Sequence, residues 1–131
     1  MCSSDLIFRW GMPSGSSLKT RVNDESYCQE LGLKTPVVEN SLWEDPIIEF
    51  STKLENVDRI ISYAEAKEIA GLSDSEFEEL KNLSLLLAYQ LKRVFEKSEI
   101  ILWDGKFEFG FGKNRELMVV DSIGQIGRAH V

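Results

Sequence analysis

Acidic and basic residues alternate near the end of the chain, at Asp104, Lys106 and Glu108. Because side chains alternate across a β-strand, these three share one face if the segment is extended. A returning strand that contains Asp121 would bring a further carboxylate to that face, one diagonal step from Glu108. Two carboxylates on a rigid sheet repel unless a cation lies between them, and Mg²⁺ bound by carboxylates and phosphate oxygens is a common arrangement. Lys106 would then neutralise charge on a transferring phosphoryl group.

This arrangement requires a β-hairpin, which we predict from strands near residues 99–111 and 115–123. If Lys113-Asn114 is a two-residue turn, Lys106 lies opposite Asp121. The other face of the first strand would bury its aromatic side chains against a long helix: Trp103, Phe107 and Phe109. A solvated hairpin face with cross-strand ion pairs is the alternative, and it needs no ligand.

A second candidate site combines Arg9 with the segment Gly15-Ser16-Ser17-Leu18-Lys19. Small residues let backbone N–H groups approach an anion, while arginine and lysine supply positive charge. The segment lacks the Gly-x4-Gly-Lys-Ser/Thr spacing of a Walker A loop. An ordinary polar turn is therefore the alternative interpretation.

The elements that would position these residues follow an α+β pattern. Ser73 and Glu76 form a capping box, and apolar residues then recur at helical spacing through Phe95. A shorter helix at 63–70 precedes it and is stopped by a glycine. Strands are predicted at 7–10 and 47–52, with a loop between Pro36 and Pro46 and a helical turn at 27–33. The order strand, loop, strand, two helices and hairpin predicts an antiparallel sheet with two helices packed on one face.

Composition limits the function classes. The chain has 131 residues, a net charge of −7 and 43% hydrophobic residues, which suits a globular domain or part of one. The acidic balance argues against binding to nucleic acid. No apolar run approaches the ~20 residues of a membrane span. Two cysteines cannot build a disulfide framework, so a reducing cytoplasm is the expected location.

The two ends of the chain can be encoded by DNA strings that are reverse complements of each other. Residues 126–131 can be back-translated as ATC GGA AGA GCA CAC GTC, and the reverse complement, read from its GTG as a start codon, encodes Met-Cys-Ser-Ser-Asp. The string also resembles a common sequencing adapter. We therefore predict that residues 1–6 and 125–131 are adapter-derived and that 7–124 is a fragment of a natural protein; chance is the alternative. The prediction excludes His130 from catalysis and leaves Cys28 as the only native thiol.

Taken together, these segments resemble the SAICAR synthetase (phosphoribosylaminoimidazole-succinocarboxamide synthase) family. Its hairpin strand reads Leu-Val-Asp-Phe-Lys-Leu-Glu-Phe-Gly, and residues 102–110 here read Leu-Trp-Asp-Gly-Lys-Phe-Glu-Phe-Gly. The segment from 117 to 121 resembles the next strand, which ends in an acidic residue. Arg9 and residues 15–19 resemble the family's arginine and its Gly-Ser-Leu segment ending in lysine. Asp58 stands in the place of an Asp-Pro-containing segment.

The resemblance implies the C-terminal lobe of an ATP-grasp-like ligase. Such an enzyme joins L-aspartate to the carboxylate of the imidazole ribotide CAIR, using ATP and Mg²⁺. A carboxylate is a poor electrophile, and phosphorylation makes it an acyl phosphate that the amine can attack. The site residues that it implies are Lys106 and Asp104 as catalytic residues, Glu108 and Asp121 for ATP and metal, and Arg9, Ser16, Lys19 and Asp58 for substrate, with Asp104 also contacting the ribotide.

Two other functions remain open at this point. One is a non-enzymatic acidic α+β interaction module, which nucleotide protection dependent on Mg²⁺ would distinguish. The other is a different ATP-grasp or kinase-like ligase, which substrate assays would distinguish. The expected partners are small molecules, and the oligomeric state of the full-length parent is left open. Because the family's phosphate loop would lie upstream of Ile7, we expect no ligase activity from the chain alone; ADP formation dependent on CAIR and aspartate would contradict this.

Overall fold

The computed structural model describes residues 4–52, 59–121 and 126–130. Within these ranges no helix is both long and apolar enough to cross a membrane. The elements in chain order are β1 (Ser4–Gly11), the 3-10 helix η1 (Ser17–Thr20), α1 (Glu25–Leu31), β2 (Leu42–Thr52), β3 (Ile60–Ile61), α2 (Tyr63–Ala70), α3 (Asp74–Lys97), β4 (Ile101–Phe111), β5 (Leu117–Asp121) and β6 (Ile126–His130).

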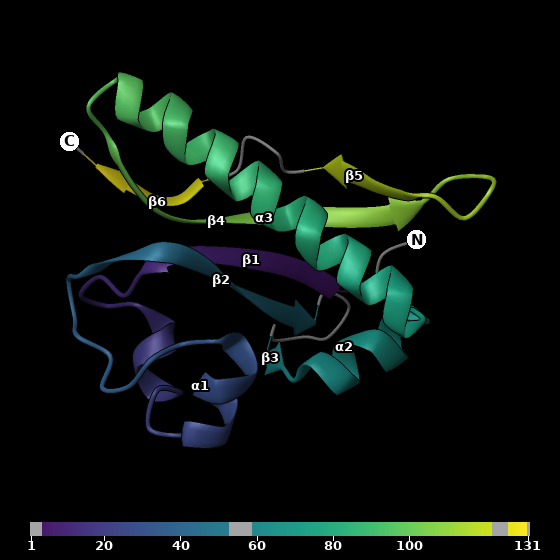
Figure 1. The fold of residues 1–131 in the computed structure, drawn as a ribbon, viewed down its shortest axis with the longest axis horizontal. Helices are drawn as coiled ribbons and strands as arrows, with labels where there is room; N and C mark the ends of the chain where they lie inside the picture. The colour runs from purple at the N-terminus through teal and green to yellow at the C-terminus, as the bar shows by residue number, and fades with distance from the viewer. Residues whose placement is uncertain (1–3, 53–58, 122–125, 131) are drawn as a thin grey trace.

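The strands form one antiparallel sheet in the order β3-β2-β1-β4-β5, and β6 also pairs with β4. The N-terminal part of β4 pairs with β6, and the C-terminal part of β4 pairs with β5. Strands β6 and β5 therefore lie one after the other along the same side of β4. In Figure 1, α3 crosses the sheet in front of β4 and β1, α2 continues the same layer, and α1 lies apart beside β2. The predicted α+β fold with two helices on one face is confirmed.

The core lies between the sheet and the pair α2 and α3. Leu6, Phe8 and Trp10 alternate along β1 and are completely buried in it. The rings of Phe8 and Phe107 lie 5.2 Å apart between centroids, which adds an aromatic contact to apolar burial. From α3 the core receives Phe77, Leu80 and Ala88. The buried side chains that alternate along the strands therefore pack against those that recur at helical spacing on α3, in one core layer.

The helix ends agree with the local sequence. α2 spans the eight residues predicted for it, with Gly71 at its C-cap in the left-handed conformation. Ser73 and Glu76 form the predicted capping box of α3, with each side chain bonded to the other's backbone N–H. Gly32 ends α1 in the left-handed conformation, so the predicted helical turn is a short helix.

Loss of the α3 capping box is expected to cost measurable stability. Ser73→Ala removes the acceptor for the Glu76 N–H and should lower the free energy of unfolding by about 1 kcal/mol. Thermal unfolding followed by circular dichroism measures this change. Gln90→Ala, on the exposed side of the same helix, is the control, and an equal loss in both variants would contradict the capping role.

Strand β2 begins earlier than predicted. It starts at Leu42, so Pro46 lies inside the strand and does not end a loop. The reason is an irregularity in the β1–β2 ladder, where Arg9 pairs with Ile47 but Gly11 already pairs with Leu42. Proline has no N–H to give to a ladder, and it is tolerated where the pairing is interrupted.

The hairpin register also differs from the prediction. Phe109 pairs with Val119, and after a bulge Glu108 pairs with Asp121, whereas the prediction placed Lys106 opposite Asp121. The predicted two-residue turn is wrong, because Gly112 bonds to Glu116 around residues 113–115, and this longer turn shifts the register by one residue. The extra residue of the bulge adds a second shift, which a count from the turn cannot anticipate. Asp121 is therefore directly opposite Glu108 along the backbone and not one diagonal step away.

Trp103 is a second correction on β4. Phe107 and Phe109 join the core beneath α3 as predicted, but Leu102 takes the place expected for Trp103. The Trp103 side chain is buried next to Gly11, where an added Cβ would lie 2.6 Å from the indole ring and 2.5 Å from a backbone oxygen. Glycine is thus required at position 11 by the close approach of this ring.

Both terminal segments take part in the sheet. β1 begins at Ser4, and Leu6 is completely buried; residues 126–130 form β6 along β4. Residues that we predicted to be adapter-derived therefore form strands here. Their adapter origin remains a prediction.

Candidate functional site

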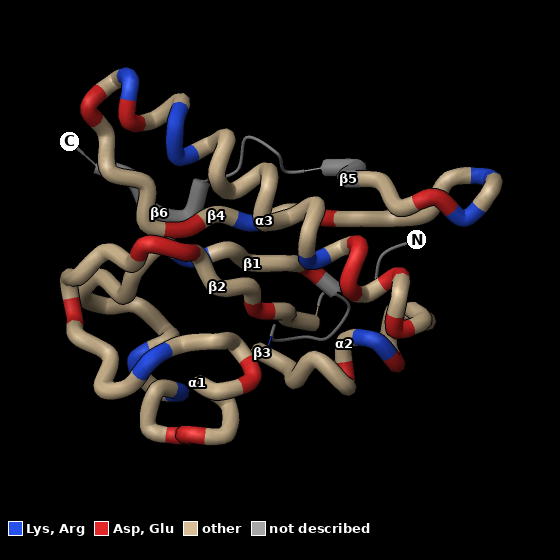
Figure 2. The backbone as a smooth tube through the Cα atoms, in the orientation of Figure 1, with Lys and Arg blue, Asp and Glu red and all other residues tan. Residues whose placement is uncertain are grey.

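A charged face lies on the side of the sheet opposite α2 and α3. The ladder pairs Arg9 with Asp104, and Lys106 and Glu108 follow on alternate positions of β4. Figure 2 shows the resulting sequence of acidic and basic positions along β4. Arg9 and Asp104 are each 5% exposed, with Nη1 of Arg9 3.6 Å from Oδ2 of Asp104. Four of the predicted site residues therefore lie on one face, and we call them the charged face.

Lys106 and Glu108 occupy the more accessible part of the charged face. The Lys106 side chain is 32% exposed, and its Nζ lies 3.9 Å from Oδ2 of the buried Asp5. Glu108 is partly exposed, and the register places it between Asp5 on β1 and Asp121 on β5. Three acidic positions therefore form a row across three neighbouring strands.

Oxygen ligands of this kind suit Mg²⁺. Among the described side chains no group of three or more histidine, cysteine, aspartate or glutamate residues is arranged to hold a metal. The Asp121 side chain lies outside that set, and only its backbone register is described. The donor chemistry of Glu108 with its neighbouring acidic positions fits a hard divalent ion.

Glu49 on β2 is the centre of a buried ionic cluster beside the charged face. It is 0% exposed and accepts hydrogen bonds from three side chains. Arg9 Nε donates at 2.5 Å, Arg21 Nε and Nη2 each donate at 2.9 Å, and the Tyr27 hydroxyl donates at 2.5 Å. A buried carboxylate is tolerated only when paired and hydrogen-bonded in this way. We call Arg9, Arg21, Tyr27 and Glu49 the Glu49 cluster.

The cluster determines the charge state of its members. Burial by itself would raise the pKa of Glu49, but the hydrogen bonds and charges of Arg21 and Arg9, together with the Tyr27 hydroxyl, lower that pKa below its usual value. Burial and the neighbouring Glu49 carboxylate raise the pKa of Tyr27. Glu49 is therefore ionised and Tyr27 protonated at neutral pH.

The lowered pKa of Glu49 predicts a pH-dependent stability. Because the folded-state pKa lies below the unfolded value of 4.5, the unfolded chain binds the proton first as the pH falls. The stabilisation is complete above about pH 4.5 and is lost as the pH falls through the folded-state value. Urea unfolding at a series of pH values should show a steeper acid loss in the unmodified chain than in Glu49→Gln. Parallel curves would contradict the ionised cluster.

The remaining predicted substrate residues have different positions. Ser16 is buried and its hydroxyl caps η1 by accepting from the Leu18 N–H, while its neighbour Ser17 lies 3.4 Å from Arg9 Nη2. Lys19 is exposed and its Nζ lies 3.5 Å from Oε2 of Glu39. Asp58 lies outside the described residues. The structure thus places the Ser16–Ser17 turn near Arg9 without bringing Lys19 into the cluster.

Three members of the Glu49 cluster, Arg21, Tyr27 and Glu49, were not among the predicted site residues. A glutamate within the apolar run Ile47-Ile48-Glu49-Phe50 was the available sign, because a charge in a buried strand must be paired. Arg21 and Tyr27 lie in a polar stretch of weak periodicity. Nothing local marks these two residues as partners of β2.

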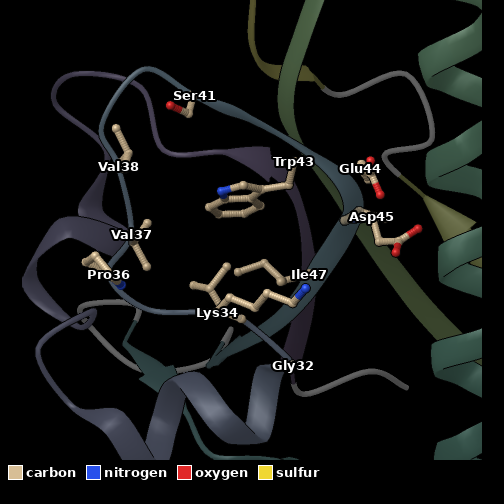
Figure 3. A pocket seen from close by; sticks show the side chains of 12 residues that line it. Gly32, Lys34, Pro36, Val37, Val38, Ser41, Trp43, Glu44, Asp45 and Ile47 are labelled. Carbon is tan, nitrogen blue, oxygen red and sulfur yellow. The ribbon is translucent and has the colours of Figure 1, made fainter.

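A cavity of about 490 Å³ lies beside the loop that leads into β2, and one of its lining residues is Ile47, the ladder partner of Arg9. In Figure 3, Trp43 lies over Lys34 and Ile47, with Val37 at one side. None of the predicted site residues whose side chains the structure describes lines it. Concave shape alone would favour this cavity, but the converging charges favour the charged face as the candidate site.

Comparison with known proteins identifies the family of the chain. A family model described as SAICAR synthetase matches residues 5–126. The chain belongs to the SAICAR synthetase family. A putative phosphoribosylaminoimidazole-succinocarboxamide synthase from Archaeoglobus fulgidus is 45% identical over 121 residues, covering 92% of this chain and 36% of the relative. The synthase from Pyrococcus furiosus is 34% identical over 91 residues, covering 69% of this chain and 38% of the relative.

Solved structures of the family have the same fold. SAICAR-synthase from Saccharomyces cerevisiae, complexed with SAICAR, matches with a TM-score of 0.70 and 31% identity, over 92% of this chain and 38% of that one. A SAICAR synthetase in complex with ADP matches with a TM-score of 0.70 and 28% identity, over 92% of this chain and 45% of that one. The chain spans less than half the length of these relatives. The predicted family and fold are therefore confirmed for this chain.

Proposed function

We propose that the full-length protein is a purine-biosynthesis ligase that joins L-aspartate to the carboxylate of CAIR, with ATP converted to ADP and phosphate. The observation that carries the proposal is the charged face, where Arg9, Asp104, Lys106 and Glu108 converge on neighbouring strands. Membership of the SAICAR synthetase family and the names of its relatives support it. We propose with it a cytoplasmic location and small-molecule partners.

The residues of the charged face have distinct roles in this proposal. Lys106 interacts with the phosphates of ATP and stabilises charge that develops during phosphoryl transfer. Asp104, beside Arg9, contacts the ribotide. Glu108 and Asp121 hold Mg²⁺, which when bound neutralises phosphate charge and orients the transferring group. The row of acidic positions across β1, β4 and β5 supports this assignment.

Substrate recognition is proposed for the end of the sheet near η1. Arg9 presents a planar guanidinium suited to carboxylate or phosphate, and Ser16 lies in the adjoining turn. Lys19 and Asp58 complete the proposed substrate set, Lys19 as an exposed cation on the loop. The acyl phosphate of CAIR would form between these residues and Lys106.

The test uses a full-length chimaera in which residues 5–126 replace the matching segment of the Archaeoglobus fulgidus relative. Glu108→Gln should abolish the Mg²⁺-dependent part of ADP binding, because it removes a metal ligand, and should change stability by only about 0.5 kcal/mol. Isothermal titration with and without Mg²⁺ measures the binding. Glu96→Gln makes the same charge change on the exposed end of α3 and is the control.

Two outcomes would contradict the proposal. Mg²⁺-dependent ADP binding that survives Glu108→Gln would remove the metal role of the hairpin. A chimaera that binds ADP but forms none from ATP with CAIR and aspartate would point to a different ligase. ADP formation that requires both substrates is the expected result.

A further inference from the structure

Glu49 binds side chains from three elements that lie 22 to 40 residues away from it in sequence. It lies on β2 and receives Arg9 from β1, Arg21 from the end of η1 and Tyr27 from α1. Both carboxylate oxygens are occupied: Oε1 by Arg9 and Arg21, and Oε2 by Arg21 and Tyr27. With no exposed surface, Glu49 cannot itself touch a ligand from solvent in this arrangement.

The bond to Glu49 orients the Arg9 guanidinium. Because Nε is held by Glu49 and the group is planar, the directions of the two terminal nitrogens are determined. Nη1 lies 3.6 Å from Asp104 on the charged face, and Nη2 lies 3.4 Å from the Ser17 hydroxyl. Glu49 therefore fixes which side of the Arg9 guanidinium faces β4 and the turn.

Arg21 links Glu49 to the Ser16–Ser17 turn. Its Nε and Nη2 bind Glu49 as a fork, while Nη1 donates to the Ser17 carbonyl at 3.0 Å and Nη2 lies 3.4 Å from the Ser17 hydroxyl. Both arginines thus meet at Ser17, next to Ser16. Glu49 holds Arg9 directly and the Ser16–Ser17 turn through Arg21.

We propose that Glu49, with Arg21, is a positioning residue for recognition of an anionic ligand by Arg9 and Ser16. The inference rests on the proposed function, which supplies the ribotide CAIR as that ligand. Glu49 does not contribute attraction, because its charge is negative like that of the ligand. It contributes by holding the donors in one arrangement before the ligand arrives.

For Glu49→Gln, the proposal and charge alone predict opposite changes in affinity for an anion. Glu49→Gln makes the site more positive by one charge, so simple Coulomb attraction predicts tighter binding of an anion. Loss of positioning predicts weaker binding, by at least about tenfold. Arg21→Lys keeps the charge but loses the planar fork, and it should also weaken binding.

The experiment titrates CAIR into the 131-residue chain and its variants at a temperature at which circular dichroism shows each to be fully folded. Glu44→Gln, with the same charge change at an exposed position of β2, is the control and should leave the affinity unchanged. Tyr27→Phe removes one hydrogen bond to Glu49 but retains Arg9 and Arg21. If Glu49 acted only through stability, Tyr27→Phe and Glu49→Gln would leave the affinity of the folded proteins unchanged.

A second readout is the Nε–H resonance of Arg9 by NMR, which should exchange slowly in the unmodified chain and rapidly in Glu49→Gln. Equal or tighter CAIR binding by Glu49→Gln overturns the inference and leaves the proposed function standing. Absence of CAIR binding by the unmodified chain overturns the proposed ribotide site and the inference with it. If Glu49→Gln does not fold, unchanged CAIR affinity in Arg21→Lys overturns the inference.

Discussion

Lys106→Met is expected to lower kcat of the full-length chimaera by about 10²–10³-fold, with a smaller change in KM. The physical reason is the position of the ammonium group on the charged face, between Asp104 and Glu108 along β4. Its side chain is partly exposed and makes a long ionic contact of 3.9 Å with Asp5. A positive charge in this place stabilises negative charge that develops on a transferring phosphoryl group, and methionine retains the length without the charge.

The measurement is steady-state ADP formation with CAIR and aspartate present. Lys113→Met, in the exposed turn between β4 and β5, makes the same chemical change away from the charged face and should have no effect. A loss of activity of only about threefold in Lys106→Met would mean that the residue is an ion-pair partner of Asp5 and not a catalytic group.

Glu49→Leu is expected to lower the free energy of unfolding by about 3–5 kcal/mol, because it leaves buried Arg9 and partly buried Arg21 without their shared carboxylate. Leucine is close in size, so the loss arises from uncompensated charge and unmade hydrogen bonds more than from a cavity. Urea unfolding at neutral pH measures the change.

Glu44→Leu on the same strand is the matched control, since that side chain is exposed and should change stability by about 0.5 kcal/mol or less. A loss below about 1 kcal/mol in Glu49→Leu would be typical of a surface ion pair and would contradict the buried cluster. A large loss that disappears when the pH is lowered well below the usual glutamate pKa would support it, because the unmodified chain then loses the same interaction.

Local features could be predicted where their causes are local. The capping box of Ser73 and Glu76 and the glycine after α2 determine helix ends through bonds within one turn, and both were predicted correctly. The alternation of Asp104, Lys106 and Glu108 predicts one charged face because a strand places every second residue on the same side. The similarity of residues 102–110 to the family strand identified the family before any contact was known.

Tertiary structure alone decided the features that depend on distant segments. The bulge that places Asp121 opposite Glu108 arises from strand pairing, and the early start of β2 arises from a ladder irregularity at Arg9. The Glu49 cluster joins β1, the end of η1, α1 and β2, and no spacing within one segment encodes that meeting. The sequence by itself therefore determined the charged face and the family, because these depend on short-range pattern. The partners that hold Arg9 depend on which remote strands and loops pack together, and only the fold decides that.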